Sequence, residues 1–158
     1  MQLDDLLGRF AASGQVAAGS AAALTVTVAA GLVAMVARAS RDSWEDAGGV
    51  AAQAISLQER AAWLIREDAD AWLEAFAALG GTGEGDAAKR NFELERKLER
   101  AAAVPLEIGE LGASVAELAA LAGEFGVGHV RADAVAAAAL AAGATRAVAH
   151  LVDVNLGV

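Results

Sequence analysis

The segment 63–76, WLIREDADAWLEAF, carries three carboxylates within four positions, at Glu67, Asp68 and Asp70. Spacing of apolar residues three and four apart predicts a helix here, so a helical wheel shows which carboxylate is unusual. Glu67, Asp70 and Glu74 fall together on one polar face. Such a face is typical of a helix surface in contact with water. These residues alone therefore indicate no chemistry.

Asp68 falls on the other side of the wheel, between Ala75 and Leu79. The apolar arc around it consists of Ile65, Ala69, Trp72, Phe76 and Leu79, extended by Leu64 and Ala75. A carboxylate there must accept hydrogen bonds, meet a cation or bind a proton, because burial of a bare charge is costly. Desolvation would raise the pKa of Asp68 and suit it to proton transfer near neutral pH. A buried aspartate with a structural role is the alternative.

Few other residues compete with Asp68 for a chemical role. The chain has no cysteine, and the spacing of His129 and His150 does not match a pair of metal ligands on one helix. We therefore expect exposed histidines and no metal site. Ser20, after Gly19, stands where a helix should start, so it is predicted to be an N-cap, with anion binding as a second possibility.

The elements that position these residues are predicted to be helices. Alanine-rich apolar stretches, a single proline and the lack of useful period-two alternation indicate an all-α helical bundle. We predict one domain, residues 1–158, with five helices. The predicted helices cover residues 2–12, 19–40, 46–79, 85–125 with a bend at Pro105, and 131–156.

Charge and hydropathy exclude several classes of partner. The net charge of −9 argues against a surface for nucleic acid or an anionic membrane, because phosphate binding requires a basic face. Residues 20–37 are uncharged, but their small side chains favour a buried helix over a membrane span, and no second span is expected to follow. The acidic start, MQLDDLLGRF, is unlike a signal peptide, so we expect a cytoplasmic protein.

Several short motifs occur in a recognisable order along the chain. They are GSAAAL (19–24), LVAMVAR (32–38), EDADAW (67–72), AAVPLEI (102–108), GVGHVRAD (126–133) and LVDVNL (151–156). In this order and separation the chain resembles the formimidoyltetrahydrofolate cyclodeaminase and methenyltetrahydrofolate cyclohydrolase family over nearly its whole length.

The resemblance implies an antiparallel helical bundle that forms a homodimer. It also implies a tetrahydrofolate derivative as the substrate and no metal, with the folate in a cleft lined by the glycine-rich turn, the acidic helix and the terminal motif. Alignment of the acidic motif places the catalytic aspartate at Asp68, which the helical wheel also selects. The residues implied to bind the substrate are Gly19, Ser20, Asp133 and Asn155.

Two functions follow from the resemblance as expectations. The first is a cyclohydrolase or cyclodeaminase acting on 5,10-methenyl- or 5-formimino-tetrahydrofolate. The alternative is a catalytically inactive dimeric bundle that binds or scaffolds, which apolar residues at Val127 and Leu151 would suit because the family has asparagines there. The anionic glutamate tail of a folate would require a cation. The candidates for that cation are Arg41, Lys89, Arg90 and Arg131.

Overall fold

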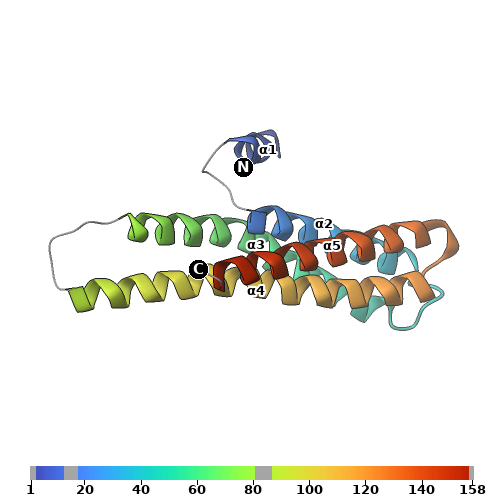
Figure 1. The fold of residues 1–158 in the computed structure, drawn as a ribbon. Helices are drawn as coiled ribbons and strands as arrows, with labels where there is room; N and C mark the ends of the chain where they lie inside the picture. The colour runs from blue at the N-terminus through green and yellow to red at the C-terminus, as the bar shows by residue number, and fades with distance from the viewer. Residues whose placement is uncertain (1–2, 13–17, 81–86, 157–158) are drawn as a thin grey trace.

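The computed structural model describes residues 3–12, 18–80 and 87–156, and the regular elements within these ranges are all helices. They are α1 (Leu3–Ala11), α2 (Ala18–Ala39), α3 (Ala47–Leu79), α4 (Ala87–Phe125), the short 3₁₀ helix η1 (Gly128–Val130) and α5 (Arg131–Leu156), as drawn in Figure 1. The all-α prediction is confirmed, and each predicted helix agrees with an observed one within two residues at either end. α4 continues through Pro105, so the predicted bend there stays a prediction.

Helices α2 to α5 form a four-helix bundle, and α2 is its central member. α2 packs against α3, α4 and α5, while α1 lies apart from the bundle in Figure 1. Half of the residues of α2 are buried, nearly all of them alanine, valine or glycine. The uncharged segment 20–37 is therefore a core helix, as its small side chains predict.

Small residues let these helices approach one another closely. At Gly31 of α2, an added Cβ atom would lie 2.7 Å from the side-chain nitrogen of Gln58 on α3. At Gly112 of α4, it would lie 3.4 Å from both the Ala141 carbonyl oxygen and a methyl carbon of Val26. The space that a side chain would occupy is thus already filled by a neighbouring helix. Alanine and glycine in the core set the helix spacing as much as the larger side chains do.

Within the part of the chain that the structure describes, two helical segments are long and apolar enough to cross a membrane, by length and composition alone. The first is α2, with a mean hydropathy of 2.0, and 56% of its most apolar window is buried inside the bundle. The second is Gly128–Asp153, with a mean hydropathy of 1.5 and 22% of its window buried. This second candidate was not expected from the sequence, because charged residues interrupt its apolar stretches. Burial within the bundle accounts for the composition of α2.

One end of the bundle, which we call the turn end, is closed by short connections from α2 to α3 and from α4 to α5. Ser40 is buried there and donates a hydrogen bond to the Val36 carbonyl oxygen at 2.7 Å. The same hydroxyl accepts a hydrogen bond of 3.1 Å from the amide of Val127. The rings of Trp44 and Phe125 stack beside it, with centroids 5.8 Å apart. One serine therefore links the two connections.

At the other end, α3 and α4 extend beyond their neighbours. α3 has 33 residues against 22 in α2, and α4 has 39 against 26 in α5. The excess forms a helical hairpin, residues 69–79 with 87–99, which projects to the left in Figure 1 and which we call the α3–α4 arm. The large apolar side chains exposed on the arm are Trp72, Leu73, Phe76, Leu79, Phe92 and Leu98.

The predicted apolar arc of α3 was wrong in the part of the helix that belongs to the arm. Trp72, Phe76 and Leu79 are exposed in this chain, where the wheel placed them in the buried sector. The face that is buried carries mainly small residues, including Ala71 and Ala75. The wheel assumed that the largest apolar side chains face the core. In this bundle the buried face of α3 consists mainly of alanine, and the large apolar side chains of the arm are exposed.

Ion pairs join the two helices at the base of the arm. The Arg100 guanidinium of α4 donates to the carboxylates of Glu67 at 2.8 Å and Glu74 at 2.9 Å, both on α3. The basic segment 89–100 is otherwise mostly exposed. Its last arginine pairs across to α3 rather than along its own helix.

We predict that Ser40→Ala destabilises the protein by about 1–3 kcal/mol, because the partly buried amide of Val127 would lose its acceptor. Ser114→Ala is the matched control, since that exposed hydroxyl bonds only to the Glu110 carbonyl within its own helix. The control should change stability by no more than about 0.5 kcal/mol. Urea denaturation of both variants measures the difference, and equal values would contradict the role given to Ser40.

Candidate functional site

Asp68 lies on the buried side of α3, at the level where α2 begins. Its exposed fraction is 5%, whereas Asp70 is exposed to solvent. The helical wheel predicted this difference correctly. Asp68 shares its face of the helix with Leu64 and Ala61, which are fully buried. The one carboxylate that periodicity selected is thus the one withdrawn from water.

The partner of Asp68 is the first turn of α2. The hydroxyl of Ser20 donates a hydrogen bond to Oδ2 of Asp68 at 2.9 Å, and the backbone N–H of Ser20 also bonds to this carboxylate. Ser20 itself is 0% exposed. Prediction of Ser20 as an N-cap was wrong: α2 is already helical at Ala18, and the hydroxyl bonds across to α3 instead of to its own helix.

Burial is the main influence on the acidity of Asp68. Loss of water raises the pKa of this carboxyl above its ordinary value, because the charged form is poorly solvated there. The hydrogen bonds from the hydroxyl and amide of Ser20 oppose the shift by stabilising the anion, yet the pKa remains raised. The positive end of the α2 dipole also favours the ionised form. Asp68 is therefore a weak acid that can both donate and accept a proton.

The structure brings some of the predicted site residues together and separates others. Gly19 lies directly against the carboxylate of Asp68. Asp133 stands in the first turn of α5, at the turn end, while Asn155 stands in its last turn. The two residues are 22 positions apart, which corresponds to about 33 Å of helix. One chain therefore does not bring Asp133 into the same site as Asp68.

Part of the predicted cleft lies beyond what the structure describes. The side chain of Asn155 is outside the described residues, as are residues 16–17 of the glycine-rich turn at 16–20. The backbone of α5 nevertheless ends on the same side of the bundle as Asp68, since α5 runs from the turn end towards the arm (Figure 1). The N-terminal turn of α2, Asp68 and the end of α5 thus share one end of the bundle.

The cations proposed for a glutamate tail are widely separated. Arg41 and Arg131 lie at the turn end, and Arg131 donates to the Gly126 carbonyl oxygen at 3.1 Å. Lys89 and Arg90 are exposed in the first turn of α4, at the far end of the arm. Within one chain, only the second pair is on the same side of the bundle as Asp68.

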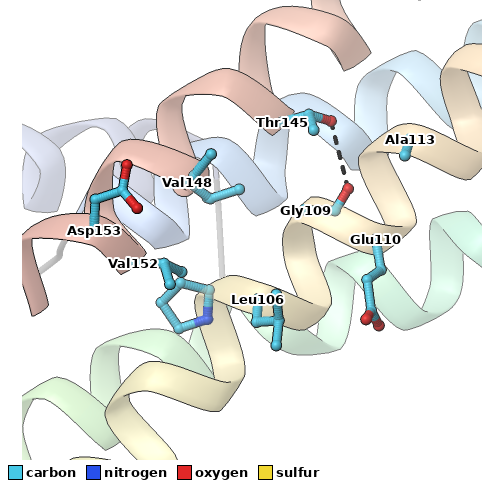
Figure 2. A pocket seen from close by; sticks show the side chains of 10 residues that line it. Leu106, Gly109, Glu110, Ala113, Thr145, Val148, Val152 and Asp153 are labelled. Carbon is cyan, nitrogen blue, oxygen red and sulfur yellow. Dashed lines mark hydrogen bonds between the residues drawn. The ribbon is translucent and has the colours of Figure 1, made fainter. Parts of the chain in front are cut away.

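A groove of about 370 Å³ between α4 and α5 is separate from Asp68. Figure 2 shows Val148 and Val152 of α5 facing Leu106 of α4, while the side chain of Glu110 extends away from α5. The Thr145 hydroxyl spans the two helices with a long hydrogen bond of 3.5 Å to the Gly109 carbonyl oxygen. The groove is lined mainly by hydrocarbon and offers no acid that is withdrawn from solvent.

Among the residues described here, no three histidine, aspartate or glutamate side chains gather as ligands for a metal ion. His129 and His150 are exposed, as their spacing led us to expect.

Comparison with known proteins agrees with this arrangement. The family model of formiminotransferase-cyclodeaminase matches residues 2–158. The chain belongs to this family. The crystal structure of formiminotetrahydrofolate cyclodeaminase from Thermotoga maritima matches 99% of this chain and 79% of that one, with a TM-score of 0.87 at 21% identity. At that identity the likeness shows a common fold. A search of curated proteins found no match.

Membership of the formiminotransferase-cyclodeaminase family confirms the resemblance inferred from the motifs. The role of Ser20 as a donor to Asp68 was missed, because the two residues are 48 positions apart and each helix was considered separately. A signal was present: both residues had been singled out, and a buried carboxylate needs a donor.

We predict that the pH dependence of stability reveals the raised pKa of Asp68. Between the ordinary value of 3.8 and the raised one, the folded protein retains a proton that the unfolded chain has released. The stability of the wild type relative to Asp68→Asn should therefore fall as pH rises through this window and be level below it. Urea denaturation at a series of pH values measures this difference.

Asp70→Asn is the control, because Asp70 is exposed on the same helix. Its stability curve should run parallel to that of the wild type. If the wild type instead gained stability relative to Asp68→Asn as pH rises, the raised pKa would be contradicted.

Proposed function

We propose that the protein is a folate enzyme of the cyclodeaminase type, acting on 5-formimino- or 5,10-methenyl-tetrahydrofolate as a cyclodeaminase or a cyclohydrolase. The observation that carries the proposal is a buried, hydrogen-bonded acid, Asp68, in a chain that the family model matches from end to end. Both reactions require a proton to move between two atoms bonded to one carbon. A single weak acid beside that carbon can perform this transfer.

In the cyclodeaminase direction, N10 of the folate attacks the protonated formimino carbon attached to N5. The ionised carboxylate of Asp68 accepts the proton that N10 loses. The resulting carboxylic acid then gives this proton to the amino group, which leaves as ammonia. The products are the 5,10-methenyl cation and ammonia, and Asp68 returns to its ionised form.

In the cyclohydrolase direction, water adds to the methenyl carbon, which carries the positive charge shared by N5 and N10. Asp68 accepts a proton from the attacking water, and its negative charge stabilises the cationic substrate. The bond between this carbon and N5 then breaks as N5 takes up a proton from Asp68, while the hydroxyl of the adduct releases its proton to solvent and becomes the carbonyl of the formyl group on N10. A carboxyl group with a raised pKa can supply that proton more readily than an ordinary aspartate.

The inactive-scaffold alternative is less well supported. It was suggested by Val127 and Leu151, but Val127 belongs to the turn end, where its amide bonds to Ser40. That contact is structural and lies far along the bundle from Asp68. A scaffold would have no need to keep a carboxylate with a raised pKa inside the bundle, because burial of such a group reduces stability.

Substrate recognition and location complete the proposal. Gly19, Ser20, Asp133 and Asn155 were implied as substrate-binding residues, and of these Ser20 is better suited to holding Asp68, since no part of it is exposed. Lys89 and Arg90 are the favoured cations for a glutamate tail because the arm carries them on the Asp68 side. We place the enzyme in the cytoplasm, in line with its acidic composition and its folate chemistry.

We further propose that the protein is a homodimer in which the α3–α4 arm contacts a second copy. The arm exposes several large apolar side chains, with Phe76 and Phe92 each 65% exposed. Contiguous apolar surface of this kind marks an interface more often than a solvated face. The arm segment 89–100 is also basic in a chain of net charge −9, so a second copy offers it an acidic surface.

We predict that Asp68→Asn lowers turnover of formimino- or methenyl-tetrahydrofolate by at least about 10²-fold, because it removes the proton-accepting oxygen from a nearly isosteric side chain. Asp70→Asn should leave turnover close to that of the wild type. Both are measured by the absorbance of the methenyl product or substrate. Equal losses in the two variants would show that the reacting acid has been misassigned.

We predict that the wild type is a dimer by light scattering and that the double variant Phe76→Ser with Leu79→Ser is a monomer. Val135→Ser is the control, because Val135 is 63% exposed on α5, outside the arm. The control should remain dimeric. A monomeric wild type, or a dimer that withstands the double substitution, would reject the arm as the interface.

A further inference from the structure

Gly19 is the second residue of α2, and its missing side chain leaves the space in which the carboxylate of Asp68 sits. A Cβ atom built on Gly19 would lie 2.6 Å from Cγ and 2.8 Å from Oδ2 of Asp68, and closer still to Oδ1. Carbon atoms in proteins essentially never approach so closely. Because all three carboxyl atoms are near this one point, the carboxyl group rests against the Cα atom of Gly19.

Ser20 supplies the polar half of the same contact. Its hydroxyl and its amide both donate to Asp68, and none of the residue is exposed. A serine in this position has no surface left with which to touch a folate. Its donors are directed to the aspartate.

We propose that Gly19 and Ser20 are positioning residues for Asp68: Gly19 admits the carboxylate to the start of α2, and Ser20 holds it there in a fixed orientation. The proposal deepens the proposed function, because it assigns to these two residues the aspartate as a partner in place of the substrate. The geometry can nevertheless be tested without any assay of turnover.

Gly48 provides a matched comparison within the same chain. It is the second residue of α3 and follows an alanine, as Gly19 does in α2. An added Cβ atom at Gly48 would have nothing within 4 Å. The requirement for glycine at position 19 therefore comes from Asp68 and not from the position in the helix.

We expect Gly19→Ala to lower the melting temperature by about 5 °C, because the new methyl group and the carboxylate would overlap. Gly48→Ala should leave it unchanged or raise it by about 2 °C, since alanine favours the helix. In a chain that already carries Asp68→Ala, Gly19→Ala should no longer lower the melting temperature. Such non-additivity isolates the contact between the two residues.

The pKa of Asp68, followed by carbon NMR of its carboxyl group, gives a second readout. Ser20→Ala should raise this pKa further, because it removes a hydrogen bond that stabilises the anion. Gly19→Ala should lower it, because the displaced carboxylate regains water and loses the main cause of its shift. A residue with a purely structural role would not move the pKa in these opposite directions.

Turnover is measured last, so that the two proposals can fail separately. If Asp68 is the reacting acid, its displacement by about 1 Å in Gly19→Ala should cost about 10²-fold in kcat, while Gly48→Ala keeps wild-type activity. The expected melting and pKa changes without turnover in the wild type would reject the enzyme and retain the positioning. Additive melting changes, or a pKa of Asp68 that neither variant moves, would overturn the positioning itself.

Discussion

Close approach of α2 to its neighbours is the constraint on which the rest of this structure depends. A helix that touches three others has little room for large side chains, so the buried residues of α2 are nearly all alanine, valine or glycine. Where apolar side chains of α3, α4 and α5 face α2, the close approach of the helices forms an apolar core. At the start of α2 the neighbour offers the carboxylate of Asp68, and only glycine leaves space for it. The packing of the bundle and the placement of its acid thus have one origin.

Much of the fold could be predicted from the sequence because its signals are local. Alanine-rich apolar stretches predicted every α-helix that the structure describes, and the uncharged run identified the buried one, α2. The side of a helix on which a residue lies also depends on local sequence alone. The wheel could therefore predict that Asp68 is buried and Asp70 exposed. The order of the motifs led to the family independently, and both routes arrived at the same aspartate.

What could not be predicted depends on contacts between distant segments. The wheel assumed that large apolar residues of α3 face the core, but Trp72 and Phe76 lie on an arm that α2 and α5 are too short to cover. The bond from Ser20 to Asp68 requires the register of α2 against α3, which no single helix contains. Asp133 was grouped with Asp68 by motif alone, and the length of α5 separates them.

The unequal helix lengths have a consequence for motion. Towards the tip of the arm, the described parts of α3 and α4 extend beyond α2 and α5 (Figure 1), so fluctuations that fray the tip disrupt few buried contacts. Arg100 pairs with the carboxylates of Glu67 and Glu74, which lie about two turns apart on α3 at the base of the arm. Arg100 therefore joins α4 to α3 by ion pairs at the base of the arm, where fraying from the tip should stop. Asp68 lies between these ion pairs and the core of the bundle, so its surroundings can stay ordered when the tip of the arm frays.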